Sequence, residues 1–354
     1  MSYAEVMGAL TGERRGLSEA ELAPLVADLL DDRMPLAQAG ALLIALRMKD
    51  ESVTEVVTLA KAISQKTRRI EVKRRPLAAI DIVSLDGAQA SSAMLGAALT
   101  VGGAGFPTVQ HGSMAGAETR ASSTEPGIAD LLAALDVNLH LPRGAVADGI
   151  DKTGYGFMLA RYSCASLGQL TSVFRELTVP TIFNLAAPFA NPAMPEVRIV
   201  AVTDPESVGR TAEALRLFGA QRGYVFCLED DVLTRAGKIA LFEKRGSQTF
   251  DFRARDHGLS EIALQWPSGS AADQARELDA TLRGKSSGPM VELMVLTAGL
   301  TLHALGAAPT LAKSFAMARE SLTQRKAENV LAAIRKAYAT AEVTDDGRTS
   351  KVHW

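Results

Sequence analysis

The sequence has few cysteines and no long apolar run, and both absences narrow the class of protein. Its two cysteines, Cys164 and Cys227, form neither a C-x-x-C pair nor a disulfide framework, which fits a reducing cytoplasm. No apolar run reaches the ~18 residues of a membrane span, and the first residues lack the basic and apolar regions of a signal peptide. We therefore expect a cytoplasmic protein with no membrane contact.

An excess of one charge is also absent. The chain has 38 Lys and Arg against 40 Asp and Glu, a formal net charge of −2. The whole molecule therefore does not attract nucleic acid, and any such binding needs a local basic patch. Aromatic residues make up only 5%, so the core must be built mainly from Ala, Leu, Val and Ile. The 354 residues suffice for one large domain and a smaller one, or for two domains.

Residues 1 to about 70 predict helices only. Ser18 with Glu21, and Ser52 with Glu55, have the spacing of capping boxes at the starts of two amphipathic helices. Between them, residues 36–48 predict a helix that is apolar on almost all sides. A helix of this kind is buried, either in a core or in a subunit interface.

A basic segment follows at residues 66–75 and ends at Pro76. It holds six basic residues and one acid. Our interpretation is a solvated linker into the rest of the chain, and the alternative is a segment that contacts phosphates.

From residue 77 onward, predicted strands and helices alternate. This order favours an α/β fold with a mostly parallel central sheet covered by helices. The expected strands are 80–83, 107–110, 181–185, 198–202, 224–228 and 239–243, with an antiparallel pair within 238–252. The expected helices are 127–135, 144–153, 164–177, 207–218, 289–305 and 310–338. We predict a helical domain at 1–75, an α/β domain at 76–340 and a polar tail at 341–354.

The stretch 81–136 organises the α/β part. A buried strand breaks at residues 84–88, a small-residue helix covers 91–102, and a second strand leads to His111 and Gly112. A glycine-containing turn between a strand and a helix is typical of phosphate sites, because free N–H groups at the helix start attract anions. An ordinary turn between strand and helix is the alternative.

Several motifs carry a resemblance in chain order from about residue 17 to 340. They are the runs 17–22 and 41–51 of the helical start, Ile80-Asp81-Ile82-Val83, His111-Gly112, Ser122-Ser123, the run 127–135 and the run 181–192. With them the chain resembles the anthranilate phosphoribosyltransferase family (glycosyltransferase family 3), and within it the divergent YbiB-like branch. The resemblance implies a small helical domain joined to a large α/β domain of the nucleoside phosphorylase and phosphoribosyltransferase type. It also implies a substrate cleft between the domains and a homodimer through the helical domain.

The chain departs from the family at the diphosphate site. Family enzymes displace pyrophosphate from phosphoribosyl pyrophosphate with the amine of anthranilate, and magnesium neutralises the leaving group. The family's G-T-G-G-D-G becomes Ser84-Leu85-Asp86-Gly87-Ala88-Gln89, with one glycine kept. Its T-F-N-I-S-T becomes residues 92–97, without the asparagine or the metal-binding serine, and its K-H-G-N-R becomes residues 110–114, without the lysine or the asparagine.

The anthranilate and magnesium positions also differ. The family's pocket histidine falls near Cys164, and its pocket arginine falls on Phe174, with Arg175 beside it. The magnesium pair falls on Leu233-Thr234, a few residues after the acids at 229–231. We therefore predict no cofactor, and magnesium could bind only if the loop register shifted to bring those acids into place.

The resemblance and the turn together predict the ligand- or phosphate-binding residues, with no metal ligand and no catalytic residue assigned. They are Ser84, Asp86, Gly87, Ala88, Ser92, His111, Gly112, Ser122, Ser123, Asn184 and Arg175. Structural alternatives stay open: a satisfied turn for His111, N-capping for Ser123, a strand-end tie for Asn184 and a solvated surface position for Arg175.

Three functions follow as hypotheses. The first is a diverged member that has lost anthranilate transfer and binds a phosphate-bearing ligand, such as a phosphoribosyl compound, a nucleotide or single-stranded nucleic acid, in the interdomain cleft. The alternative is an active pentosyl- or phosphoribosyltransferase with a different acceptor. The third is a structural dimer that serves a partner protein, which an exposed apolar patch away from the dimer face would favour.

Overall fold

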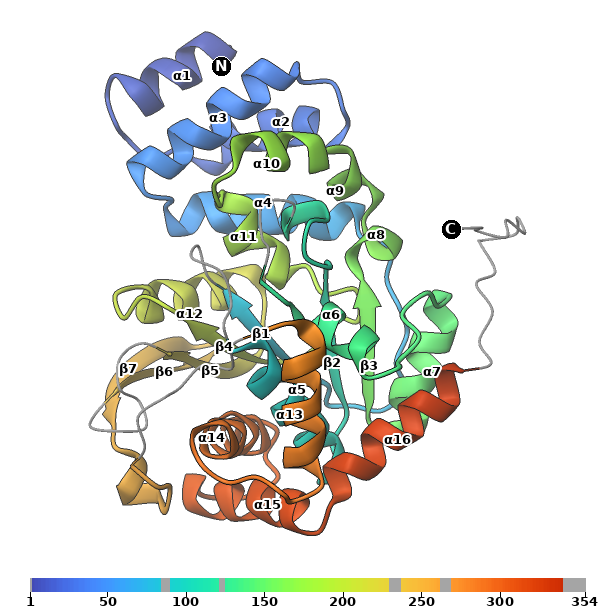
Figure 1. The fold of residues 1–354 in the computed structure, drawn as a ribbon. Helices are drawn as coiled ribbons and strands as arrows, with labels where there is room; N and C mark the ends of the chain where they lie inside the picture. The colour runs from blue at the N-terminus through green and yellow to red at the C-terminus, as the bar shows by residue number, and fades with distance from the viewer. Residues whose placement is uncertain (1, 84–89, 121–124, 229–236, 262–268, 340–354) are drawn as a thin grey trace.

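A layer of helices forms one end of the molecule (Figure 1). The computed structural model describes residues 2–83, 90–120, 125–228, 237–261 and 269–339. The layer begins with α1 (Tyr3–Thr11), α2 (Glu19–Leu30), α3 (Leu36–Lys49) and α4 (Val53–Lys66). Both predicted capping boxes are confirmed, because Glu21 and Glu55 accept hydrogen bonds from the backbone N–H groups of Ser18 and Ser52 at 2.8 and 2.7 Å. No helix in the described ranges is long and apolar enough to cross a membrane.

Helix α3 is apolar on both its buried and its exposed sides. Leu42, Leu43 and Leu46 are buried in the helical layer. Leu36 and Met48, at its two ends, are 54% and 77% exposed. Part of the apolar surface predicted for this helix is therefore open to solvent in the single chain.

The turn between α3 and α4 is stabilised by a buried ion pair. The Lys49 Nζ lies 2.9 Å from Glu55 Oε2, and both side chains are almost fully buried. The other carboxylate oxygen of Glu55 accepts a hydrogen bond from the Leu17 backbone N–H at 2.8 Å. Glu55 therefore joins three segments of the helical layer through its two oxygens.

The large part of the chain is built on a seven-stranded sheet with the order β3-β2-β1-β4-β5-β6-β7. The strands are β1 (Ala78–Val83), β2 (Thr108–Gly112), β3 (Tyr155–Leu159), β4 (Val197–Val202), β5 (Arg222–Cys227), β6 (Gly237–Glu243) and β7 (Gly246–Phe252). The pairs among β1 to β5 are parallel, and β6 and β7 add an antiparallel edge. The predicted mostly parallel sheet is confirmed.

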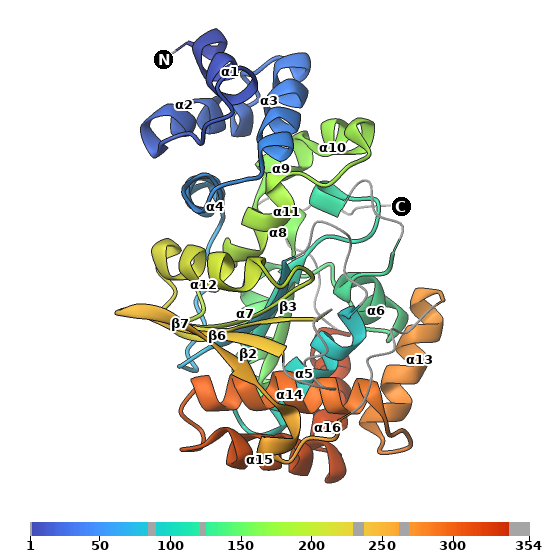
Figure 2. The ribbon, with the colours of Figure 1, turned by 90° about the vertical axis from the view of Figure 1, so that its left-hand side faces the viewer.

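Helices cover both faces of the sheet (Figures 1 and 2). Helix α12 (Ser207–Phe218) lies on one face. Helices α5 (Ser91–Gly103) and α14 (Pro289–Ala304) lie on the other, almost fully buried. The remaining helices of this part are α6 (Ile128–Ala134), α7 (Arg143–Thr153), α13 (Ala271–Leu282), α15 (Leu311–Thr323) and α16 (Lys326–Tyr338). Three-residue and four-residue 3-10 turns occur at η1 (Glu118–Arg120) and η3 (Ala254–His257).

Glycine allows α5 to approach its neighbours closely. A Cβ on Gly103 would lie 2.7 Å from the backbone N of Ala327 at the start of α16. The small-residue composition of α5 is therefore a packing requirement on this side of the sheet.

Three secondary-structure predictions were wrong. Residues 181–185 form not a strand but α11 (Ile182–Ala186), which Thr181 caps by accepting a hydrogen bond from the Phe183 N–H at 3.3 Å. The helix predicted over 310–338 is two helices, because Arg325 adopts a left-handed backbone with φ +57°. The helix predicted over 164–177 is divided into α9 (Ala165–Gln169) and α10 (Thr171–Leu177).

The chain returns to the helical layer after β3. The returning segment consists of α8 (Ala160–Ser163), α9, α10, α11 and the 3-10 turn η2 (Ala187–Phe189). Leu167, Phe174 and Phe183 of this segment share one apolar cluster with the buried residues of α1 to α4. The helical layer is thus completed by residues far along the chain, beyond the 1–75 segment predicted for it.

The basic segment 66–75 is packed against the α/β part. Ile70 and Val72 are buried. Lys66 forms an ion pair with Asp31, and Arg75 forms one with Glu196 at 2.9 Å. The basic side chains of this segment are mostly exposed, as expected for a solvated linker, but its apolar residues enter the core and acids neutralise part of its charge.

Candidate functional site

The carboxyl ends of β1, β2 and β4 face the helical layer at the point where the strand order reverses. β2 and β3 extend the sheet to one side of β1, and β4 and β5 extend it to the other. In open α/β sheets, ligands bind outside the carboxyl ends at such a switch point. A predicted site residue is therefore in position to contact a ligand if it lies at this carboxyl edge of the sheet.

His111 lies at this edge, near the end of β2. Its Nε2 is 3.2 Å from the carbonyl oxygen of Ala187 in η2. Since a carbonyl can only accept, Nε2 donates, and Nδ1 of the neutral ring is left as an acceptor. Burial, aided by the positive charge of Arg198, lowers the pKa of His111 to about 4. The neutral ring therefore presents a buried acceptor, Nδ1, that has no hydrogen-bond partner within the described ranges.

Two serine hydroxyls at the same edge share this property. Ser92 lies in the first turn of α5, and Ser113 directly follows β2. Both side chains are buried, and neither Oγ has a hydrogen-bond partner in the part of the chain that the structure describes. A buried unpaired hydroxyl is costly, so two of them at one edge of the sheet favour a site that a ligand or ordered water completes.

A buried ion pair between β1 and β4 lies next to the carboxyl edge of the sheet. Arg198 Nη2 of β4 lies 3.0 Å from Asp81 Oδ2 of β1. The same guanidinium also donates to the backbone carbonyls of Pro188 and Phe189 in η2. Burial outweighs the attraction of Arg198 and raises the pKa of Asp81 to about 6. The pair holds η2 over the sheet edge, and η2 in turn receives the hydrogen bond from His111.

Not every predicted site residue is placed for ligand binding. Gly112 ends β2 beside His111, as predicted. Asn184 instead caps α11, because its Oδ1 accepts a hydrogen bond from the Thr181 N–H at 2.9 Å. Arg175 lies exposed in the last turn of α10, which favours the solvated alternative. The residues that lie outside the described ranges are Ser84, Asp86, Gly87, Ala88, Ser122 and Ser123.

The substituted family positions have structural roles of their own. Gln110, where the resemblance expects lysine, is fully buried, donates to the carbonyl of Ile80 at 2.7 Å and accepts from Tyr155 Oη at 3.0 Å. Cys164 and Phe174, at the expected pocket histidine and arginine, are buried in the apolar cluster of the helical layer. The anthranilate pocket implied by the resemblance therefore lacks both polar side chains.

The described residues do not fit a magnesium site. They contain no group of three or more His, Cys, Asp or Glu side chains that could hold a metal ion. Met94 and Gly96, at the family's asparagine and metal-binding serine, are buried in α5 and carry no side-chain oxygen. The acids at 229–231 lie outside the described ranges.

Reasoning from the sequence missed Arg198, Ser113 and a second ion pair. Arg161 Nε of α8 lies 3.5 Å from the buried carboxylate of Glu118 in η1. Arg198 stands in an apolar strand, Ile-Val-Ala-Val, and a lone arginine there was the available signal of a buried partner. Ser113 carried no such signal, because a serine after a strand is common in any turn.

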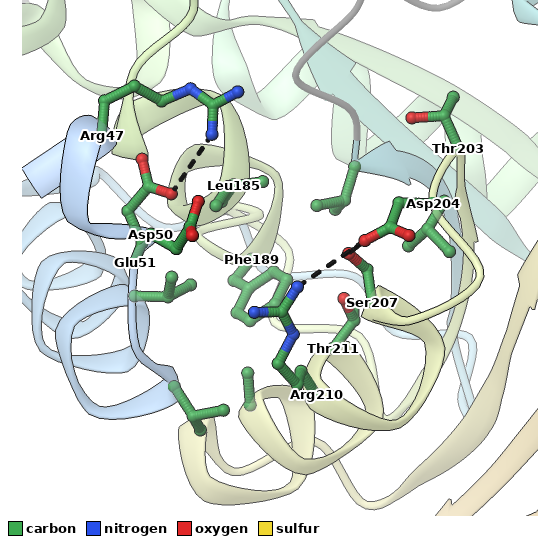
Figure 3. Close-up of a pocket in the computed structure, with 15 residues that line it drawn as sticks. Arg47, Asp50, Glu51, Leu185, Phe189, Thr203, Asp204, Ser207, Arg210 and Thr211 are labelled. Atoms are coloured by element: carbon green, nitrogen blue, oxygen red, sulfur yellow. Dashed lines mark hydrogen bonds and ion pairs between the residues drawn. The ribbon is translucent and has the colours of Figure 1, made fainter.

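A cavity of about 250 Å³ lies between the helical layer and α12 (Figure 3). Its walls are the turn between α3 and α4, the carboxyl ends of β1 and β4, and the first half of α12. Leu185 and Phe189 line it, whereas Ala187 between them contacts His111. The segment α11–η2 therefore contributes to the cavity lining and also binds His111.

The fold defines a class of two-part protein with a helical layer over the carboxyl edge of an α/β sheet. Comparison with known proteins agrees. Residues 77–328 match the model of the α/β domain of a glycosyl transferase family, and residues 9–67 match its helical bundle domain.

Full-length relatives carry one activity in their names. Anthranilate phosphoribosyltransferases from Thermus thermophilus and Rhodospirillum rubrum are 32% and 33% identical, over 88% and 92% of this chain and 92% of each relative. The solved structure of a Thermus thermophilus anthranilate phosphoribosyltransferase is 29% identical with a TM-score of 0.83, covering 96% of this chain and 100% of that one. A Saccharomyces cerevisiae structure, 18% identical, shares the fold with a TM-score of 0.80 over 96% and 98% of the two chains.

The chain belongs to this glycosyl transferase family, as an anthranilate phosphoribosyltransferase-like member. The resemblance seen in the sequence is thereby confirmed at the level of the family.

Proposed function

We propose that this chain is a diverged member of the family, on its YbiB-like branch, that binds a phosphorylated ribose ligand at the carboxyl edge of the sheet and has lost anthranilate transfer. One observation carries the proposal: Ser92 Oγ, His111 Nδ1 and Ser113 Oγ are buried at one edge without hydrogen-bond partners in the described chain. Two hydroxyls and the N–H groups at the start of α5 suit a phosphate. The His111 acceptor suits a sugar hydroxyl, because a neutral Nδ1 accepts but cannot donate.

The loss of anthranilate transfer has a separate support. Cys164 and Phe174 replace the polar pair of the implied anthranilate pocket, and Gln110 is committed to structural hydrogen bonds. Departure of pyrophosphate needs charge neutralisation at the leaving group. The described residues offer neutral donors and acceptors at the edge instead.

Phosphoribosyl pyrophosphate is the first ligand to test, since the Saccharomyces cerevisiae relative was solved in complex with PRPP and Mg. The experiment is a calorimetric titration of the whole protein, with and without magnesium, beside an assay of pyrophosphate release with anthranilate. We expect saturable binding and no release. We expect Ser92→Ala to weaken binding about tenfold, the loss of one hydrogen bond to a charged group, and the exposed Ser172→Ala, a matched control on α10, to leave it unchanged.

The other outcomes separate the alternatives. Release of pyrophosphate with anthranilate would refute the lost activity, and release with a different amine would establish the alternative acceptor. No heat with phosphoribosyl pyrophosphate, together with salt-dependent binding of a single-stranded oligonucleotide, would move the function to nucleic acid. The ion pairs of Lys66 and Arg75 weigh against that outcome, because they neutralise part of the basic segment.

The proposal includes a cytoplasmic homodimer. The exposed Leu36 and Met48 on α3 support association through the helical layer, and the two free, buried cysteines fit a reducing compartment. Light scattering on the eluting protein measures the assembly: a mass twice that of the chain is expected, and the mass of one chain would contradict the dimer.

A further inference from the structure

The cavity between the helical layer and α12 contains a buried carboxylate with unused hydrogen-bonding capacity. The side chain of Glu51 is 3% exposed, and its Oε1 has no hydrogen-bond partner in the described chain. Arg47 Nη1 lies 3.8 Å from the other oxygen, Oε2, beyond hydrogen-bond distance. Burial raises the pKa of this carboxyl group. A carboxylate in such a position is stabilised by a donor that enters the cavity.

Apolar side chains form one part of the remaining lining of the cavity, and polar and charged side chains form the other. Val53, Val56, Leu185, Phe189 and Val202 line it. At the α12 side, Asp204 accepts a hydrogen bond from Ser207 Oγ at 2.7 Å and lies 3.6 Å from the half-exposed Arg210 (Figure 3). The volume of about 250 Å³ has room for about eight water molecules, which is enough for a small organic molecule.

The balance of charge favours a cation. The lining holds three carboxylates, those of Asp50, Glu51 and Asp204, and two guanidinium groups, those of Arg47 and Arg210. Arg47 lies near Glu51 at 3.8 Å and Arg210 near Asp204 at 3.6 Å, and the exposed Asp50 adds a third carboxylate, so the lining carries one negative charge in excess. At Glu51 itself, the contact with Arg47 is too long for a hydrogen bond and leaves Oε1 without a donor in the described chain. An ammonium group on an apolar body would neutralise that excess and fill the apolar wall.

We propose that this cavity is a binding site for a small primary amine with an apolar body, whose ammonium group donates to Glu51 Oε1. The cavity shares the carboxyl ends of β1 and β4 with the strand-edge site, but Ser92, His111 and Ser113 are not among its lining residues. A ligand here would contact both the turn of the helical layer and α12, so its binding would link the two parts of the molecule.

The test uses three probes of nearly equal size on the whole protein: phenethylamine, the neutral 2-phenylethanol and the anionic 3-phenylpropionate. Calorimetry measures affinity, and methyl NMR of the labelled Val and Leu side chains locates binding. We expect phenethylamine to bind about tenfold more tightly than 2-phenylethanol, as for a desolvated charge-assisted hydrogen bond. The shifted methyl groups should be those of Val53, Val56, Leu185 and Val202.

Variants decide the role of Glu51. Glu51→Gln keeps the shape of the side chain and should remove the preference for the amine, while Glu206→Gln, an exposed carboxylate just before α12 and outside the lining, should preserve it. Val56→Phe should abolish binding of both the amine and the alcohol by filling the cavity, and its urea unfolding midpoint shows whether it is folded. Equal affinity for amine and alcohol, tighter binding of 3-phenylpropionate, an unchanged preference in Glu51→Gln, or methyl shifts elsewhere would each overturn the proposal.

Discussion

His111 and Asp81 make stability depend on pH in opposite directions over one range. The folded-state pKa of His111 is about 4, below its ordinary 6.5, so its contribution is complete above pH 6.5 and is lost as the pH falls through 4. The folded-state pKa of Asp81 is about 6, above its ordinary 3.8, so its contribution is complete below pH 3.8 and is lost as the pH rises through 6. Between neutral and mildly acidic pH the two effects oppose each other.

The two effects are similar in size. One pKa unit corresponds to about 1.4 kcal/mol, so the interval from 6.5 to 4 gives about 3 kcal/mol for His111. The interval from 3.8 to 6 gives about 3 kcal/mol for Asp81. These two residues should therefore add little net pH dependence to the unfolding free energy of the native protein between about pH 7 and pH 4.

Single substitutions should expose each effect. Between about pH 7 and pH 4, Asp81→Asn should lose about 3 kcal/mol more stability than the native chain, and His111→Gln should lose about 3 kcal/mol less. Urea unfolding at several pH values measures this. Only the change with pH is compared, because Asp81→Asn also leaves Arg198 without its carboxylate at every pH. If both variants follow the pH dependence of the native chain, the assignment of buried, shifted groups at this edge is refuted.

Two further predictions concern packing and burial. Glu55→Gln should lower the unfolding free energy by about 3 kcal/mol, because it leaves the Lys49 charge buried and unpaired. Chemical denaturation measures this, with the exposed Glu13→Gln as a control that should lose under about 1 kcal/mol. A loss as small as that of the control would contradict the buried ion pair. Gly103→Ala should lower the unfolding free energy by at least about 2 kcal/mol, because its Cβ would meet the backbone of α16. Gly168→Ala in α9, with open space around it, should leave the unfolding free energy unchanged or raise it by up to about 1 kcal/mol. Equal melting temperatures for the two variants would disprove the close approach.

Regular patterns in the sequence were sufficient to predict most of the helices and strands. The helix predicted at 207–218 coincides with α12, because its apolar period and the following Gly219 mark both face and end. The strand predicted at 181–185 failed because Thr181 and Asn184 form a cap, and capping by side chains outweighed the β-propensity of Ile and Phe. Strand β3 was missed because Tyr155–Leu159 is short and lacks alternation when buried on both faces.

The site was predictable only in part. His111 and Ser92 could be placed at the edge from local order, since each adjoins the end of a strand or the start of a helix. The partnership of Asp81 with Arg198 could not be predicted, because it depends on β4 pairing with β1 across a long stretch of chain. The cavity near Glu51 depends on four separate segments and left no local signal.

The return of α8–α11 to the helical layer bears on how this molecule can be divided. One apolar cluster runs from α1–α4 through the returning helices to residues of β4, β5 and α12. A fragment that begins at Leu77 would keep α9–α11 but remove their partners, leaving residues such as Leu167, Phe174 and Phe183 open to water. The basic segment 66–75 is therefore a boundary in the sequence, but the protein cannot be cut there into two independently folding pieces. A domain exchange with a relative would have to transfer residues 160–189 together with the N-terminal helices.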